Sequence, residues 1–132
     1  MTEFHRSFAE INLSAIDHNL TEIKKLLPDE TKTLAVVKAD AYGHGAVQVS
    51  RLLQQLQCDY LAVSSMDEAM ELMEAETDYI ILDVRTKEEY DEKHIPGAIL
   101  IPHDEIEEQA AEKLRIEGEI AEISKMDPSI KT

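Results

Sequence analysis

Short apolar runs alternate with stripes of apolar residues at helical spacing along most of this chain of 132 residues. The strand-like runs are Leu34–Val37, Tyr60–Ser64, Tyr79–Val84 and Ala98–Ile101. Strands that alternate with helices at this pace are typical of βα units and a parallel sheet. We therefore predict an α/β fold with a mostly parallel four- to five-stranded sheet flanked by helices. Its architecture is either a three-layer α/β/α sandwich or an open half-barrel.

Helix start signals precede the helical stripes. A Ser or Thr followed three residues later by an acidic residue is a capping box, which closes the first turn of a helix. Such pairs are Ser14 with Asp17, Ser65 with Glu68, and Thr86 with Glu89. Asp104, with Glu107, is expected to open a further helix.

Two stretches outside this pattern are harder to assign. Phe8–Leu13 alternates loosely and is predicted to be an edge strand. In the tail, Ile116, Ile120 and Ile123 have the spacing of a helical face that would cross Gly118. A glycine inside a helix costs about 1 kcal/mol, which weakens this second prediction.

The charge balance limits the partners of the chain. It carries 28 acidic and 13 basic residues, for a formal net charge of −15. This argues against binding to nucleic acid and to anionic membranes, because both need clustered Lys and Arg. No apolar run approaches the roughly 20 residues of a membrane span, and no signal-peptide pattern is present. We expect a cytoplasmic protein with neither nucleic acid nor membrane as partner.

Lys38 stands where a strand-like run ends, and Gly43 and Gly45 follow it. The carboxyl ends of parallel strands are where α/β folds build their sites. Partial burial disfavours a charged ammonium and leaves an amine able to attack an aldehyde. The ordinary alternative is a lysine whose stem lies along the strand end with its head in water. The residues by themselves leave both interpretations open.

The string from Val36 to Gly45 (VVKADAYGHG) resembles the pyridoxal phosphate lysine motif of alanine racemases. The resemblance extends over residues 6–75, through Arg6, Ala9–Ile11, Leu13–Ala15, His18–Leu20 and Tyr60–Val63. It implies a (β/α)₈ barrel followed by a β domain. It also implies that Lys38 binds the cofactor covalently, that Tyr42 lies near the cofactor phosphate and that His44 supports the lysine.

Other parts of that family's site have no counterpart in this sequence. The family takes a second catalytic base, a tyrosine, from its C-terminal domain across a dimer interface, and further cofactor contacts from later barrel strands. Racemisation needs two opposed bases around one carbon. We therefore expect no full racemase activity.

A second resemblance covers residues 77–114. Tyr79–Tyr90 (YIILDVRTKEEY) and His94–Pro102 (HIPGAILIP) resemble the rhodanese (sulfurtransferase) domain in order and spacing. In structural terms, Asp83 and Arg85 can pair at a strand end, and Pro96-Gly97 can form a tight turn. His94 is predicted to be a turn or packing histidine.

Rhodanese chemistry depends on a cysteine persulfide in a later loop, and this chain has no counterpart of that cysteine. Its one cysteine, Cys58, lies upstream and is predicted to be a small, partly buried hydrophobic residue. A single cysteine also excludes an internal disulfide and a cysteine-based zinc site.

These observations predict an engineered or recombined chimera, with a natural truncated gene product as the rival origin. Residues 1–132 would form one domain. Its parts are a racemase-like segment (1–75), a rhodanese-like segment (76–115) and a tail (116–132). Tyr79–Val84 would replace the racemase's next strand.

The expected function is that of a folded scaffold without a complete active site or bound cofactor. The alternative is a residual pyridoxal phosphate binder that uses Lys38 and Tyr42, with Lys38 as the catalytic candidate. No metal site is expected, because Asp104 and Glu107 fit a helix cap better than a site with His103. We expect a homodimer through the exposed edges Phe8–Leu13 and Ala98–Ile101. A monomer protected by its own tail helix is the alternative.

Overall fold

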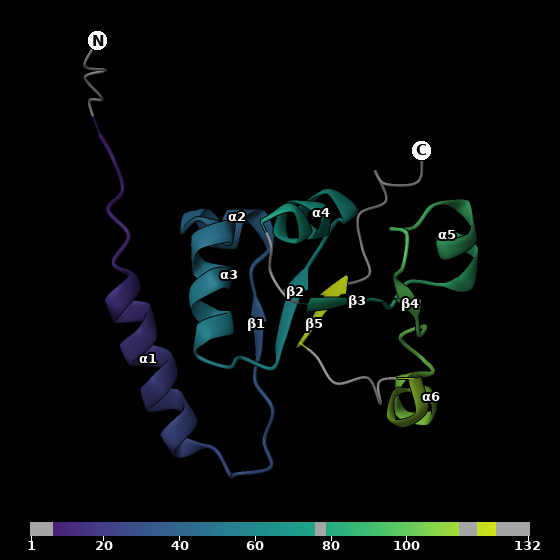
Figure 1. The fold of residues 1–132 in the computed structure, drawn as a ribbon, viewed down its shortest axis with the longest axis horizontal. Helices are drawn as coiled ribbons and strands as arrows, with labels where there is room; N and C mark the ends of the chain where they lie inside the picture. Colours follow the sequence, from purple (N-terminus) through teal and green to yellow (C-terminus); the bar gives the residue numbers. More distant parts are fainter. Residues whose placement is uncertain (1–6, 76–78, 114–118, 124–132) are drawn as a thin grey trace.

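The computed structural model describes residues 7–75, 79–113 and 119–123. The helices are α1 (Leu13–Leu26), α2 (Lys38–Gly43), α3 (Ala46–Gln55), α4 (Met66–Glu74), α5 (Lys87–Glu92) and α6 (Ile106–Lys113). The strands are β1 (Leu34–Val36), β2 (Tyr60–Val63), β3 (Tyr79–Asp83), β4 (Ile99–Leu100) and β5 (Glu119–Ile123). Figure 1 shows their arrangement.

The strands form one sheet of five strands in the order β1-β2-β5-β3-β4, and every neighbouring pair is parallel. The predicted α/β class with a parallel sheet is confirmed. The strand formed by Tyr79–Asp83, β3, does not lie directly beside β2, because β5 lies between them (Figure 1). An inner strand satisfies its backbone N–H and C=O groups on both sides, and β5 pairs in this way with both neighbours.

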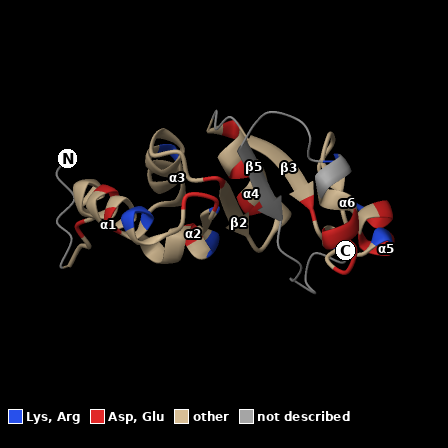
Figure 2. Cartoon of the chain, turned by 90° about the horizontal axis from the view of Figure 1, so that it is seen from below, with Lys and Arg blue, Asp and Glu red and all other residues tan. Residues whose placement is uncertain are grey.

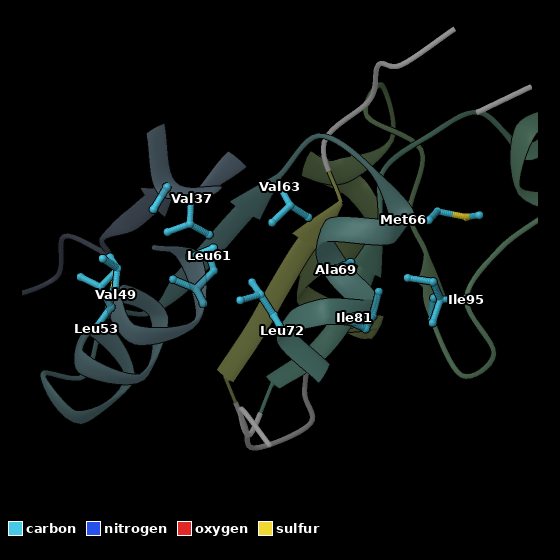
Figure 3. Close-up of a cluster of buried hydrophobic side chains, with 14 residues drawn as sticks. Val37, Val49, Leu53, Leu61, Val63, Met66, Ala69, Leu72, Ile81 and Ile95 are labelled. Atoms are coloured by element: carbon cyan, nitrogen blue, oxygen red, sulfur yellow. The ribbon is translucent and has the colours of Figure 1, made fainter. Parts of the chain in front are cut away.

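The apolar side chains divide between the two faces of the sheet. On one face, Leu61 of β2 and Ile81 of β3 pack with Val49, Leu53 and Leu72 from α3 and α4 (Figure 3). On the other, a smaller cluster of Leu82, Val84 and Ile101 is packed against α6 through Ile106 and Ala110. Successive residues of a strand point to opposite faces, so adjacent Ile81 and Leu82 serve different clusters. The result is the three-layer α/β/α arrangement.

The N-terminal segment differs from the prediction. Phe8–Leu13 is not a strand: residues 7–12 have no regular structure, and Phe8 is 84% exposed. Helix α1 begins at Leu13 because Asn12, in extended conformation, caps it by accepting a hydrogen bond from the Ala15 N–H at 3.1 Å. The predicted Ser14 capping box is therefore wrong, and the cap lies two residues earlier.

The predictions for the last elements are also corrected. Helix α6 begins at Ile106, and the Glu105 carbonyl accepts its first backbone hydrogen bonds, so Asp104 lies in the preceding turn and does not cap it. Residues 119–123 form a strand rather than a helical face. In this extended conformation their backbone pairs with β2 on one side and with β3 on the other. Residues 114–118 and 124–132, including Ile116, lie outside the described residues.

The other two caps are confirmed. Ser65 accepts a hydrogen bond from the Glu68 N–H and starts α4, and Thr86 and Glu89 form a closed capping box at the start of α5. Of the helices that the structure describes, none is long and apolar enough to cross a membrane.

A candidate site at the carboxyl edge of the sheet

Lys38 follows β1 at the edge of the sheet where the parallel strands end. The Val37 N–H donates to the Ala62 carbonyl at 2.9 Å, which extends the pairing with β2 by one residue, and Val37 is 2% exposed. The Lys38 side chain is exposed, so the expected partial burial is not found. The reason is that β1 is an edge strand. Within the described part of the chain, the structure records no hydrogen bond or ion pair of the Lys38 ammonium.

The backbone after Lys38 has an unusual conformation. Ala39, Asp40, Ala41 and Tyr42 have φ values of 51°, 55°, 52° and 54°, in the left-handed helical region. This region costs a residue with a Cβ roughly 1–2 kcal/mol. Such a segment persists only where its surroundings hold it.

Several hydrogen bonds hold the segment. The Ala41 N–H donates to the Val37 carbonyl at 2.9 Å, and the His44 N–H and Nδ1 both lie about 3 Å from the Ala41 carbonyl. The Asp40 carboxylate accepts the Ala46 N–H at 2.8 Å and so caps the start of α3. His44 therefore contacts the segment that follows Lys38, and its implied support of the lysine stays a prediction.

Glu68 ties this segment to the next strand. Its Oε1 accepts the Ala39 N–H at 2.7 Å, and its Oε2 accepts the Ser64 N–H at 2.8 Å and the Ser64 hydroxyl at 3.0 Å. Burial alone would raise the pKa of Glu68, but these hydrogen bonds outweigh it and hold the pKa below its ordinary value of 4.5. One carboxylate therefore joins the ends of β1 and β2.

Sequence reasoning missed this contact. It identified Glu68 only as the last residue of a local capping box, and the box at Thr86 has the same spacing. Sequence spacing cannot separate the two cases, because the choice depends on whether another strand end lies within reach.

Tyr42 lies in the same segment as Lys38 and is 60% exposed. The structure records no hydrogen bond between their side chains. Next to Tyr42, Gly43 has a φ of +85° and no atom within 4 Å of the position a Cβ would take. The space around this end of the segment is open.

The Asp83–Arg85 pair is confirmed. Arg85 Nη2 donates to Asp83 Oδ2 at 2.6 Å and to the Lys93 carbonyl at 2.7 Å, and Arg85 Nε lies 2.9 Å from Asp83 Oδ1. The hydrogen bonds to Asp83 raise the pKa of the Arg85 guanidinium against the effect of burial. Both side chains are buried, so the pair joins β3 to the end of α5 rather than facing a ligand.

The predicted roles of His94 and the following turn are also confirmed. The His94 ring stacks on Tyr90 with a centroid distance of 3.7 Å. The Ala98 N–H donates to the Ile95 carbonyl across Pro96 and Gly97, and Gly97 has the positive φ, +87°, that the third residue of such a turn needs.

Cys58 is 1% exposed, as expected of a packing residue. Its thiol lies 3.4 Å from the Tyr60 carbonyl. His103 Nδ1 and Asp104 Oδ1 are 4.0 Å apart, and no group of three or more His, Cys, Asp or Glu side chains in the described ranges could hold a metal ion.

A polar cleft of about 320 Å³ lies near the opposite end of the strands, where residues from the end of α1 and from the loops before β1 and β2 line it. Three of its charged side chains, Lys24, Lys32 and Asp59, already have partners. Lys24 donates to the Leu56 and Gln57 carbonyls at 2.6 and 2.8 Å, and Asp59 accepts from the Thr33 N–H at 2.7 Å. We interpret this cleft as the joint between α1 and the sheet.

The fold and the site define a parallel α/β protein with an anchored lysine segment at the carboxyl edge of its sheet. Residues 11–118 match the family "Alanine racemase, N-terminal domain". The chain belongs to this family. The match includes Lys38 and the whole segment from residue 76 to 115.

The individual proteins that the chain resembles are also alanine racemases. The chain is 49% identical over 75 residues to an alanine racemase of Geobacillus stearothermophilus, covering 56% of this chain and 19% of the relative. It is 51% identical over 83 residues to an alanine racemase of Streptococcus pyogenes (serotype M5, strain Manfredo), covering 62% and 22%. The solved structure of an alanine racemase from Clostridium difficile 630 is similar with a TM-score of 0.55 and 42% identity, over 61% of this chain and 21% of that one. The chain thus spans about a fifth of the length of these relatives.

Proposed function

We propose that this chain carries the cofactor-lysine part of an alanine racemase site and binds pyridoxal phosphate through Lys38. The observation that carries the proposal is the Lys38 segment itself. Its ten-residue motif is complete, it lies at the carboxyl edge of a parallel sheet, and its ammonium is exposed without a recorded partner in the described part of the chain.

The residues at this edge fit the chemistry of the cofactor. A primary amine can add to an aldehyde carbon, with loss of water and formation of a C=N bond. The exposed Tyr42 hydroxyl can donate a hydrogen bond to a phosphate oxygen. When bound, pyridoxal phosphate supplies an electron sink for the chemistry of amino acids. The protein's part is to hold the amine of Lys38 in one direction.

We further propose that the 132-residue chain by itself does not racemise alanine. Racemisation needs a base on each side of the reacting carbon. Among the described residues, the structure records no acid or base hydrogen-bonded to Lys38. The second candidate function, a folded scaffold that binds no cofactor, would share this lack of turnover, so the two differ only in cofactor binding.

The chimeric origin also remains a proposal. The rhodanese-like motifs at Tyr79–Tyr90 and His94–Pro102 support it, as does the strand order, because the strand after α4 does not lie beside β2. The similarity to the two racemases extends over 75 and 83 residues, close to the length of the racemase-like segment. We expect no thiosulfate sulfurtransferase activity, because the buried Cys58 is not placed to carry a persulfide.

Borohydride trapping tests cofactor binding. The chain is incubated with pyridoxal phosphate, reduced with borohydride, digested and mapped by mass spectrometry. Lys93 is the internal control, because it is also exposed and its ammonium has no recorded partner in the described residues. We expect label to concentrate at Lys38 in the wild type and in Lys93→Arg, and to be lost from this segment in Lys38→Arg. Equal labelling of Lys38 and Lys93 would favour the scaffold instead.

A further inference from the structure

We infer that Glu68 is the positioning residue for Lys38: its carboxylate fixes the peptide that follows Lys38 and so sets the direction in which the lysine leaves the sheet. The inference rests on the proposed function of Lys38 as the cofactor lysine. It concerns a residue from the next βα unit, 30 positions along the chain.

The Ala39 N–H belongs to the peptide group that begins at Lys38. Because that group is planar, a hydrogen bond to its N–H fixes the rotation of the backbone on the C-terminal side of Lys38. Glu68 Oε1 accepts this N–H at 2.7 Å, a short hydrogen bond to a charged acceptor. It acts at the point where the chain leaves β1 and enters the left-handed segment.

The other oxygen of the carboxylate anchors Glu68 to the end of β2. Oε2 accepts both the N–H and the hydroxyl of Ser64, and the Glu68 N–H is held by the Ser65 hydroxyl. Glu68 is therefore fixed at its backbone and at both oxygens. The Glu68 carboxylate therefore keeps a fixed position relative to the sheet, and its hydrogen bond to the Ala39 N–H fixes the backbone after Lys38 relative to the sheet as well.

The capping box at α5 shows that a Ser or Thr followed three residues later by Glu does not by itself bring the carboxylate into contact with another βα unit. There, the Glu89 carboxylate returns to its own N-cap and accepts the Thr86 N–H and hydroxyl, both at 3.0 Å. At α4, the carboxylate of Glu68 also reaches beyond the N-cap Ser65 and accepts N–H groups from Ser64 and from Ala39 of another unit. The same spacing serves a local cap in one helix and a connection between strands in the other.

The backbone conformation after Lys38 explains why the hydrogen bond from Ala39 to Glu68 is needed. Four consecutive left-handed residues follow Lys38, and none of them is glycine. The Asp40 carboxylate holds the far part of this segment at the start of α3. Glu68 holds its near end, so its loss would free the part of the segment that carries Lys38.

The test compares Glu68→Ala and Glu68→Gln with Glu89→Ala in the whole chain. Glu89→Ala is the matched control because it also removes the glutamate of a capping box. The first readout needs no ligand: hydrogen exchange of the peptides that cover residues 38–45. We expect exchange there to rise on the order of tenfold in Glu68→Ala, less in Glu68→Gln, and not in Glu89→Ala. Glu68→Gln keeps one acceptor oxygen and the shape of the side chain if Glu68→Ala fails to fold.

The second readout is the ratio of Lys38 to Lys93 labelling by pyridoxal phosphate and borohydride. We expect this ratio to fall several-fold in Glu68→Ala and to remain at the wild-type value in Glu89→Ala. Unchanged exchange at residues 38–45 in both Glu68 variants would overturn the positioning role, whatever the labelling. A wild-type ratio near one would instead overturn the proposed function of Lys38, while the exchange data would still decide whether Glu68 holds the segment.

Discussion

Among single residues, Asp83 and Arg85 stand out because they form a buried ion pair. Asp83 is fully buried and Arg85 is 7% exposed. Two buried charges are tolerated because they are hydrogen-bonded to each other: the guanidinium reaches both carboxylate oxygens, and it also reaches the Lys93 carbonyl. Breaking such a pair by removing one partner leaves an uncompensated buried charge.

We therefore expect Arg85→Ala to lower the free energy of unfolding by about 3–5 kcal/mol, measured by urea denaturation. Lys87→Ala serves as the control, because it breaks the exposed ion pair of Lys87 with Asp91 and should leave the midpoint unchanged. Equal effects of the two substitutions would show that the buried pair is not a major support of β3.

The protonation of Asp59 makes the stability of the fold depend on pH. Burial would raise its pKa, but hydrogen bonds from the Thr33 N–H and hydroxyl, with Lys32 nearby, hold the pKa below its ordinary value of 3.8. A carboxyl whose pKa is lower in the folded state stabilises the fold at pH above the unfolded value. That contribution is lost as the pH falls through the folded value.

We expect Asp59→Asn to be less stable than the wild type at about pH 6, with the difference shrinking as the pH falls below about 4. Chemical denaturation at a series of pH values measures this. A difference that stays constant across the series would mean that the charge of Asp59 does not contribute.

Among the elements, helix α1 has few contacts with the core. None of its side chains is buried, and only Ile16 and Leu20 pack against the core. Figure 1 shows it at one end of the molecule, beside α3. Lys24 supplies its main polar contact, through the Leu56 and Gln57 carbonyls at the end of α3.

We predict that α1 opens separately from the sheet, because local opening requires only a few apolar contacts to break. Hydrogen exchange should be faster in α1 than in α3 in the wild type, and faster still in α1 of Lys24→Met, with α3 little changed. Lys25→Met is the matched control, since Lys25 pairs with Glu22 of its own helix. Equal protection of α1 and α3 in the wild type would contradict this.

At the scale of the whole molecule, β1 and β4 are the two edges of the sheet. The predicted edge at Ala98–Ile101 is confirmed, whereas the other edge is β1 rather than Phe8–Leu13. Leu34 and Val36 of β1 are 47% and 45% exposed. Acidic residues gather on α5 and α6 beside the opposite edge (Figure 2). Exposed edges with unpaired backbone groups favour association.

We propose a homodimer that pairs β1 with β1, because the apolar side chains of β1 are more exposed than those of β4 and β1 lies away from the acidic helices. Sedimentation equilibrium should give twice the 14.9 kDa mass of the chain, and Val36→Lys should shift the equilibrium to monomer. Ile99→Lys on the other edge is the control and should leave the dimer intact. A mass of one chain at all concentrations would rule the dimer out.

Many of the elements of this protein could be predicted from local sequence patterns. Apolar runs located β1 to β4, and capping pairs located the helices α4 and α5, because burial and capping leave a direct trace in the sequence. The caps at Ser65 and Thr86, the turn at Pro96-Gly97 and the Asp83–Arg85 pair were predictable for a related reason. Each joins residues that are near one another in the chain.

The contacts between distant segments could not be predicted in this way. The insertion of β5 between β2 and β3, the exposure of Lys38 on an edge strand and the contact of Glu68 with Ala39 all depend on sheet order. No local pattern encodes that order, because backbone pairing between strands uses groups that every residue carries. For the same reason, two glutamates in the same capping pattern serve different contacts: Glu89 accepts the Thr86 N–H of its own N-cap, whereas Glu68 accepts the Ala39 N–H from the end of another strand.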